Sequence, residues 1–145
     1  MFALIDEEAS ETPTVMTGTL LIDNCYVKVL FDSGATHSFI SNNFAKSLQN
    51  RHLKNFEGEL LVRTPNGVDA RIFHKIPMIE INLAGKKLPA KVYVLNVKDF
   101  DVILRMDWLE IHYVLLDYRR KRIIFQKPRE KELELFFKSL ERRNL

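Results

Sequence analysis

Alternating apolar and polar residues run through most of the chain and predict strands. Turn signals separate these runs: Asp23-Asn24, Thr64-Pro65-Asn66-Gly67 and Ala84-Gly85-Lys86-Lys87 each favour a hairpin between the runs on either side. We therefore expect strands at residues 14–22, 25–31, 59–63, 68–73, 76–83, 88–95, 100–104, 113–117 and 122–126. Such a pattern predicts a mainly β protein.

Three segments carry helical patterns. Ser41 is a suitable N-cap for a short helix over residues 42–48, and residues 106–109 predict one helical turn. After Pro128 the apolar spacing changes to about 3.6 residues, with Leu133, Phe136, Phe137 and Leu140 on one stripe. The spacing predicts a C-terminal amphipathic helix.

The length of 145 residues suits one compact domain. We expect a flexible acidic lead-in at 1–13, a folded domain at 14–127 and the helix or a linker at 128–145. The polar segment 49–55 is expected to be a loop.

Composition narrows the class of protein. The sequence has no apolar run of transmembrane length and no leader pattern, so we expect no membrane partner and a cytoplasmic location. The one cysteine, Cys25, is expected to be a small buried hydrophobe. Basic residues gather at 119–122, but this cluster is typical of a solvated turn, and we expect no direct nucleic-acid partner.

The candidate functional residues lie in the segment 29–40, Val-Leu-Phe-Asp-Ser-Gly-Ala-Thr-His-Ser-Phe-Ile. Asp32 ends an apolar strand and is followed by Ser33 and Gly34, where the backbone can turn sharply. A carboxylate in apolar surroundings is costly unless it is paired, and such groups cluster at functional sites. Asp32 is therefore the candidate catalytic residue.

Two strings in this order closely resemble the retropepsin-like aspartic proteases, in particular those of gypsy-type retrotransposon polyproteins. They are the segment 31–40 and Asp-Val-Ile-Leu-Arg-Met-Asp-Trp-Leu at 101–109, with a hairpin between them. The resemblance covers roughly residues 15–126 and implies an all-β, closed-barrel half-lobe of the acid-protease fold. It also implies an aspartic endopeptidase that cleaves extended peptides such as polyprotein junctions, in the cytoplasm or within retroelement particles.

The chain holds only one Asp-Ser-Gly triplet, whereas hydrolysis by this route needs two carboxylates that share a proton and activate a water. The resemblance therefore implies a homodimer in which Asp32 of each copy meets at a two-fold axis. No cofactor is expected. His37, His52, His74 and His112 lack metal-ligand spacing with Cys25, so no metal site is expected either.

The resemblance also assigns supporting roles. Ser33 would hydrogen-bond across the dimer, and Gly34 would permit close approach of the backbone. Substrate would contact Ala35, Thr36 and His37 on one side. On the other side it would meet a flap made of Thr64, Pro65, Asn66 and Gly67. Asp107 and Trp108 are interpreted as structural, the first as a helix-start acid and the second as core.

Arg105 departs from the family pattern, which usually has glycine at this position. If the backbone there needs positive φ or close contact, arginine would strain or block it. Alternatively its side chain points to solvent or pairs with Asp101 or Asp107. This departure keeps a second hypothesis open, a catalytically inactive retropepsin-fold module for dimerisation or binding.

Overall fold

The computed structural model describes residues 15–22, 25–48, 54–55, 60–63 and 67–137. Its elements are β1 (Val15–Ile22), β2 (Cys25–Asp32), β3 (Phe39–Ser41), α2 (Asn42–Ser47), β4 (Lys54–Asn55), β5 (Leu61–Arg63), β6 (Asp69–Arg71), β7 (His74–Ile79), β8 (Ile81–Leu83), β9 (Lys86–Lys87), β10 (Ala90–Leu95), β11 (Val102–Leu104), α3 (Met106–Ile111), β12 (Val114–Asp117), β13 (Arg122–Phe125) and β14 (Leu133–Phe136). The mainly β prediction is confirmed.

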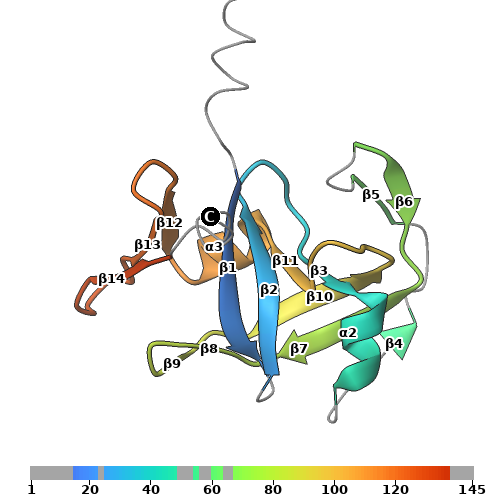
Figure 1. Ribbon diagram of the computed structural model, residues 1–145, viewed down its shortest axis with the longest axis horizontal. Helices are drawn as coiled ribbons and strands as arrows, with labels where there is room; N and C mark the ends of the chain where they lie inside the picture. Colours follow the sequence, from blue (N-terminus) through green and yellow to red (C-terminus); the bar gives the residue numbers. More distant parts are fainter. Residues whose placement is uncertain (1–14, 23–24, 49–53, 56–59, 64–66, 138–145) are drawn as a thin grey trace, which may run out of the picture.

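Nine strands form one curled sheet in the order β4-β7-β10-β3-β11-β2-β1-β8-β9 (Figure 1). The first predicted hairpin is present, since β1 pairs with β2 antiparallel along its whole length. The hairpin predicted around residues 84–87 is present with a break: β7 pairs with β10, whereas β8 pairs with β9 and with β1. Because of this break, β7 and β10 lie near one end of the nine-stranded sheet, and β8 and β9 form the other end.

Alternation explains which side chains the sheet buries. In β1 every second residue is buried, whereas the end of β2 is buried on both faces, because Val29 and Phe31 pack in one apolar cluster and Leu30 in another. Trp108 is 2% exposed, packs near Phe31, and donates from its indole nitrogen to the Leu88 carbonyl. The structural interpretation of Trp108 is thus confirmed.

The two predicted short helices are present. Ser41 caps α2, because its hydroxyl accepts a hydrogen bond from the Phe44 amide at 3.0 Å. The second helix, α3, continues two residues beyond the predicted turn. Among the described residues, no helix has the length and apolar character that crossing a membrane requires.

Two sequence expectations are wrong, and one strand was not expected. Cys25 shares a face of β2 with the buried Val27 and Val29, but it is exposed because it is the first residue of the strand. The expected loop at 49–55 contains β4, which pairs with β7. The apolar string after Gly34 includes a third central strand, β3, in addition to the predicted turn.

The predicted C-terminal helix is also wrong where the structure describes it. Residues Leu133–Phe136 form β14, the edge of a separate three-stranded sheet in the order β12-β13-β14. Leu133, Leu135 and Phe137 pack against the main core, which is the two-residue period of a strand. Leu140 lies outside the described residues.

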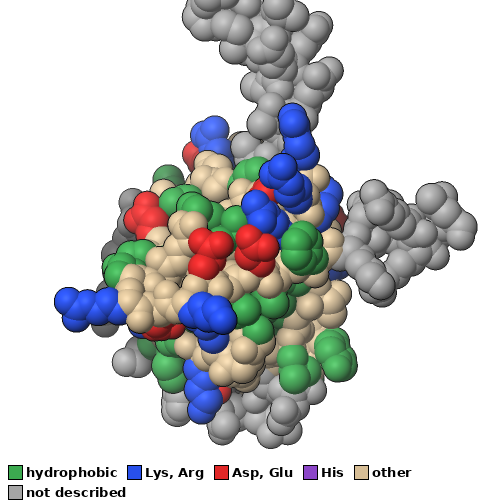
Figure 2. Space-filling view, turned by 90° about the vertical axis from the view of Figure 1, so that its left-hand side faces the viewer, with side chains coloured by type: hydrophobic (Ala, Val, Ile, Leu, Met, Phe, Trp, Pro, Cys, Tyr) green, Lys and Arg blue, Asp and Glu red, His purple; other side chains and the backbone are tan. Residues whose placement is uncertain are grey.

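Ion pairs cover the outer face of this small sheet. Arg122 on β13 donates to Asp117 of β12 at 2.8 Å and to Glu134 of β14 at 2.6 Å, and so bridges all three strands. The hydrogen bond from Arg122 lowers the pKa of Asp117 to about 2. Figure 2, which looks at this side of the molecule, shows acidic and basic side chains next to one another. The basic cluster 119–122 thus includes partners for nearby acids, as expected of a turn.

Gly18→Ala tests the new position of the C-terminal segment. A Cβ atom at Gly18 would lie 2.6 Å from Cδ1 of the Phe137 ring, so the substitution is expected to lower the free energy of unfolding by about 1–3 kcal/mol. Urea denaturation measures the loss. In a Phe137→Ala background the clash is gone, so the two losses should be less than additive. Strictly additive losses would contradict the packing of Phe137 on β1.

Candidate active site

Parallel pairing of β2 and β11 brings the two quoted strings together. The register pairs Val102 with Val29 and Leu104 with Phe31. The next residue of each strand, Asp32 on β2 and Arg105 after β11, therefore emerges at the same end of the sheet. Their proximity follows from this register, although they lie 73 residues apart in the sequence.

Asp32 is buried, with 8% of its surface exposed. Its Oδ1 accepts a hydrogen bond from the Gly34 amide at 2.8 Å, and its Oδ2 accepts one from Arg105 Nε at 3.1 Å. The first contact bends Ser33 and Gly34 back over the acid, and the second balances its charge. Each carboxylate oxygen thus has a partner within the same chain.

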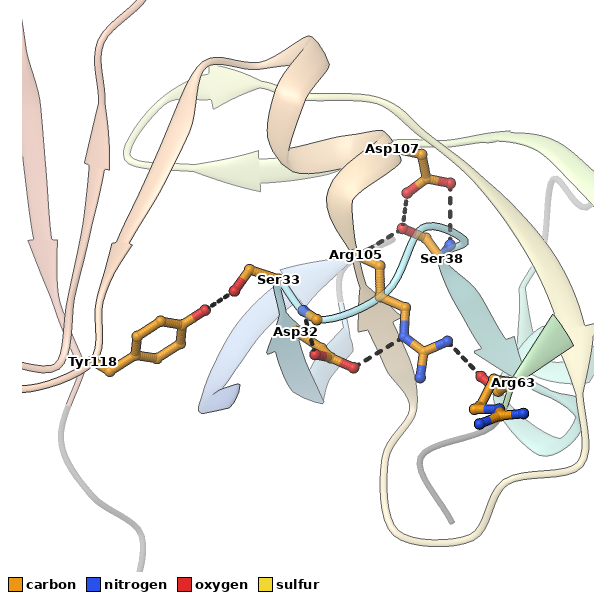
Figure 3. A network of polar contacts seen from close by, with 8 residues as sticks. Asp32, Ser33, Ser38, Arg63, Arg105, Asp107 and Tyr118 are labelled. Carbon is orange, nitrogen blue, oxygen red and sulfur yellow. Dashed lines mark hydrogen bonds and ion pairs between the residues drawn. The ribbon is translucent and has the colours of Figure 1, made fainter. Parts of the chain in front are cut away.

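Arg105 is the residue that sequence reasoning did not place. It is 2% exposed and neither strained nor solvated: its φ of −120° is ordinary extended backbone, so this position does not need glycine for conformational freedom. The guanidinium pairs with Asp32 and donates from Nη1 to the Arg63 carbonyl at 2.8 Å (Figure 3). Its Cζ lies over the Phe39 ring, 4.8 Å from the ring centre. The expected alternatives of solvent, Asp101 or Asp107 are therefore wrong.

Asp101 and Asp107 have other partners. Asp101 accepts from the Lys28 amide at 2.7 Å. Asp107 lies in the first turn of α3, as predicted, and in addition binds the loop after Asp32. Its carboxylate accepts from the Ser38 amide at 3.1 Å, from the Ser38 hydroxyl at 2.5 Å and from the Trp108 amide at 2.7 Å.

The loop that follows the acid rests on the start of α3. The carbonyl of Ala35 accepts from the Met106 amide at 3.0 Å, and that of Thr36 accepts from the Asp107 amide at 2.9 Å. Ser38 is fully buried and its hydroxyl also accepts from the Arg105 amide at 2.9 Å. The orphan amides at the beginning of the helix thus hold the loop in place.

Ser33 contacts Tyr118 within the chain, hydroxyl to hydroxyl (Figure 3). Tyr118 follows β12 and lies 85 residues from Ser33, so no local sequence pattern could have indicated it. Exposure rises after Ser33: Gly34 and Thr36 are exposed, whereas Ala35 and His37 are half-buried. His37 packs edge-on against Tyr93, with ring centres 5.5 Å apart.

The predicted flap hairpin is present at its base. β5 and β6 pair antiparallel, with Val62 opposite Ala70 and Arg63 opposite Asp69. Val62 is buried in a second apolar cluster that also contains Phe39, so the inner face of the hairpin packs on the body of the domain. Thr64, Pro65 and Asn66 lie outside the described residues, while Gly67 has a φ of +82° that suits glycine.

The structure thus brings together Asp32, Ser33 and Gly34 with Arg105 and the base of the flap. Within the described residues, no group of three or more His, Cys, Asp or Glu side chains could hold a metal ion. A buried carboxylate at a turn, with an arginine beside it and a hairpin above it, forms a compact polar site in an apolar environment.

Comparison with known families decides the identity of the fold. The family model described as retroviral aspartyl protease matches residues 1–131. The chain belongs to the retroviral aspartyl protease family. A search of curated proteins found no significant match to the chain.

Solved structures of similar fold agree with this assignment. The retroviral protease-like domain of Ddi1 from Leishmania major is 22% identical with a TM-score of 0.61, and the match covers 88% of this chain and 97% of that domain. The EIAV protease, solved with the inhibitor HBY-793, is 20% identical with a TM-score of 0.53, over 70% of this chain and 90% of that protein. Both show that the retroviral protease domain described here has the retropepsin-like fold.

Proposed function

We propose that the chain is an aspartic endopeptidase that acts as a homodimer, each copy supplying one Asp32. The observation that carries the proposal is the buried Asp32 at the turn after β2, within a domain of the retroviral aspartyl protease family. One ionised carboxylate activates the water, and a protonated one polarises the peptide carbonyl. Since one chain provides one such acid, the complete site needs two chains.

The substrate class follows from the same proposal. An extended peptide would lie between the flap, residues 64–67, and the loop formed by Ala35, Thr36 and His37, bonded through its backbone like an added strand. We propose polyprotein junctions of a gypsy-type retroelement as the natural substrate, cleaved in the cytoplasm or inside the particle. Ser33 would brace the paired loops, and Gly34 would allow their close approach.

A second function is favoured by one specific contact. The carboxylate of Asp32 already forms an ion pair with Arg105 of the same chain. A retropepsin-fold domain in which this pair is permanent would dimerise or bind peptides without hydrolysing them. The two functions differ in turnover alone.

Cleavage of unfolded casein and of polyprotein-derived peptides tests the proposal. Below the dimer dissociation constant, the rate should rise with about the square of the chain concentration, because two chains make one site. A pepstatin-like transition-state mimic should inhibit it, and Asp32→Asn is the negative control. If neither the native chain nor Arg105→Gly cleaves any substrate between acid and neutral pH while both bind peptide as dimers, the binding module is the correct function.

A further inference from the structure

Arg105 does more than form one ion pair. Its guanidinium joins two parts of the site: Nε binds the Asp32 carboxylate, and Nη1 binds the Arg63 carbonyl at the base of the flap (Figure 3). The side chain of Arg105 is 3% exposed and that of Asp32 is 12% exposed, so water screens the pair weakly. The guanidinium also lies over the Phe39 ring, a cation–π contact that adds to the attraction holding it in the site.

This geometry conflicts with that of a working pair of acids. Hydrolysis needs an oxygen of each Asp32 to face the other acid and the attacking water. Here Oδ1 is held by the Gly34 amide and Oδ2 by Arg105. The bond to Gly34 belongs to the turn itself, whereas the bond to Arg105 comes from a side chain that can move away.

The positive charge of Arg105 also conflicts with the chemistry of two acids that share a proton. Two acids in contact normally hold one proton between them, and this proton serves as the general acid. A dimer that kept both ion pairs would place a permanently charged guanidinium beside each carboxylate. Adding a proton to either acid would then leave a buried guanidinium without its counter-charge, which is costly. The general acid would be missing.

We propose that Arg105 is a built-in inhibitor of Asp32, an inference that rests on the proposed peptidase function. In the separate protomer it blocks Oδ2 and balances the charge of the acid, and it must leave Asp32 before two acids can share a proton. The bond to Arg63 makes the flap part of this arrangement, since movement of β5 removes one of the two anchors of the guanidinium.

Variants of the full-length chain test this inhibition. Arg105→Gly removes the side chain, and Arg105→Gln keeps a neutral one. Both are expected to raise kcat/KM for peptide cleavage by about 10²-fold, the lower end of what a general acid contributes. Arg105→Lys keeps a positive charge and should gain less than the glutamine variant, an order that simple loosening of the structure would not produce.

Controls separate the charge from the fold. Arg122→Gln breaks an ion-pair network of similar geometry on β13, away from the site, and should leave cleavage unchanged. Asp32→Asn added to Arg105→Gly should abolish cleavage, which assigns the gained rate to Asp32. Circular dichroism shows which variants keep the native fold, and if Arg105→Gly does not fold, the glutamine variant decides.

Three outcomes are distinguishable. Faster cleavage by the folded Gly or Gln variant supports the inhibitor. Native cleavage as fast as that of folded Arg105→Gly and Arg105→Gln overturns the inhibitor and leaves the peptidase function standing. No cleavage by any of the chains overturns both.

Discussion

Asp32→Ala is expected to end peptide hydrolysis and to lower the free energy of unfolding by about 3–5 kcal/mol. Most acids that line an active site can be removed at little cost to stability, but Asp32 is the counter-charge of a buried guanidinium. Without it the guanidinium of Arg105, a residue 2% exposed, keeps, among the described residues, its bond to the Arg63 carbonyl and its contact with Phe39. A buried charge that loses its partner carries the full penalty of desolvation.

Asp32→Asn is the matched variant for this experiment. The amide oxygen can still accept a hydrogen bond from Arg105 or Gly34, but the negative charge is lost, so the expected loss of stability is only somewhat smaller, about 2–4 kcal/mol. Hydrolysis should be lost in both variants, because neither carries a carboxylate that can activate water. Urea denaturation at equal chain concentration, together with the cleavage assay, measures the two effects separately.

Asp69→Ala supplies the control for an exposed pair. Asp69 also pairs with an arginine, Arg63, at 3.3 Å, but the two side chains are 55% and 70% exposed. Its removal is expected to change stability by less than about 1 kcal/mol. If Asp32→Ala is as stable as Asp69→Ala, the pair of Asp32 with Arg105 is not a buried ion pair in solution.

Local patterns predicted the strands because each strand has its own period and turn. The register of β1 on β2 follows from a short connection, and alternation decides which side faces the core. The parallel pairing of β2 with β11 joins segments some 70 residues apart, and nothing in either string specifies its partner.

The C-terminal segment shows how a local pattern can mislead. Residues 133–137 fit a helical stripe and a strand equally, since Leu133 and Phe137 face the core in both. The free edge of β13 decides: four residue pairs join it to β14, and Arg122 binds Glu134 on the outer face. Tertiary hydrogen bonding therefore overrides helix propensity here.

The sequence predicted the acid of the candidate site and the turn after it, but not the residue that pairs with the acid. Asp32, Ser33 and Gly34 are adjacent in sequence, and their turn is a local feature. Arg105 stood out only as a departure from the family pattern, and its effect depended on where the side chain pointed. The β2–β11 register places it beside Asp32, so the arginine that replaces the usual glycine contacts the acid directly.

Asp107→Ala is expected to lower the free energy of unfolding by about 2–4 kcal/mol, although Asp107 does not contact Asp32 in the described structure. Its carboxylate accepts three hydrogen bonds, two from Ser38 and one from the Trp108 amide. The Trp108 amide keeps a second bond to the Arg105 carbonyl, so the loss comes mainly from the buried Ser38, whose two donors are left without an acceptor at about 1–2 kcal/mol each. Urea denaturation measures the sum.

Amide hydrogen exchange localises the effect. The Ser38 amide loses its acceptor in Asp107→Ala and should exchange faster, whereas the Trp108 and Leu109 amides keep their bonds to the Arg105 carbonyl. Asp107→Asn retains one acceptor oxygen and should fall between native and alanine. The Ser38 hydroxyl also accepts a hydrogen bond from the Arg105 amide. Release of Ser38 would therefore loosen the backbone of Arg105 as well. Unchanged exchange at Ser38 would contradict this role and would separate Asp107 from the site.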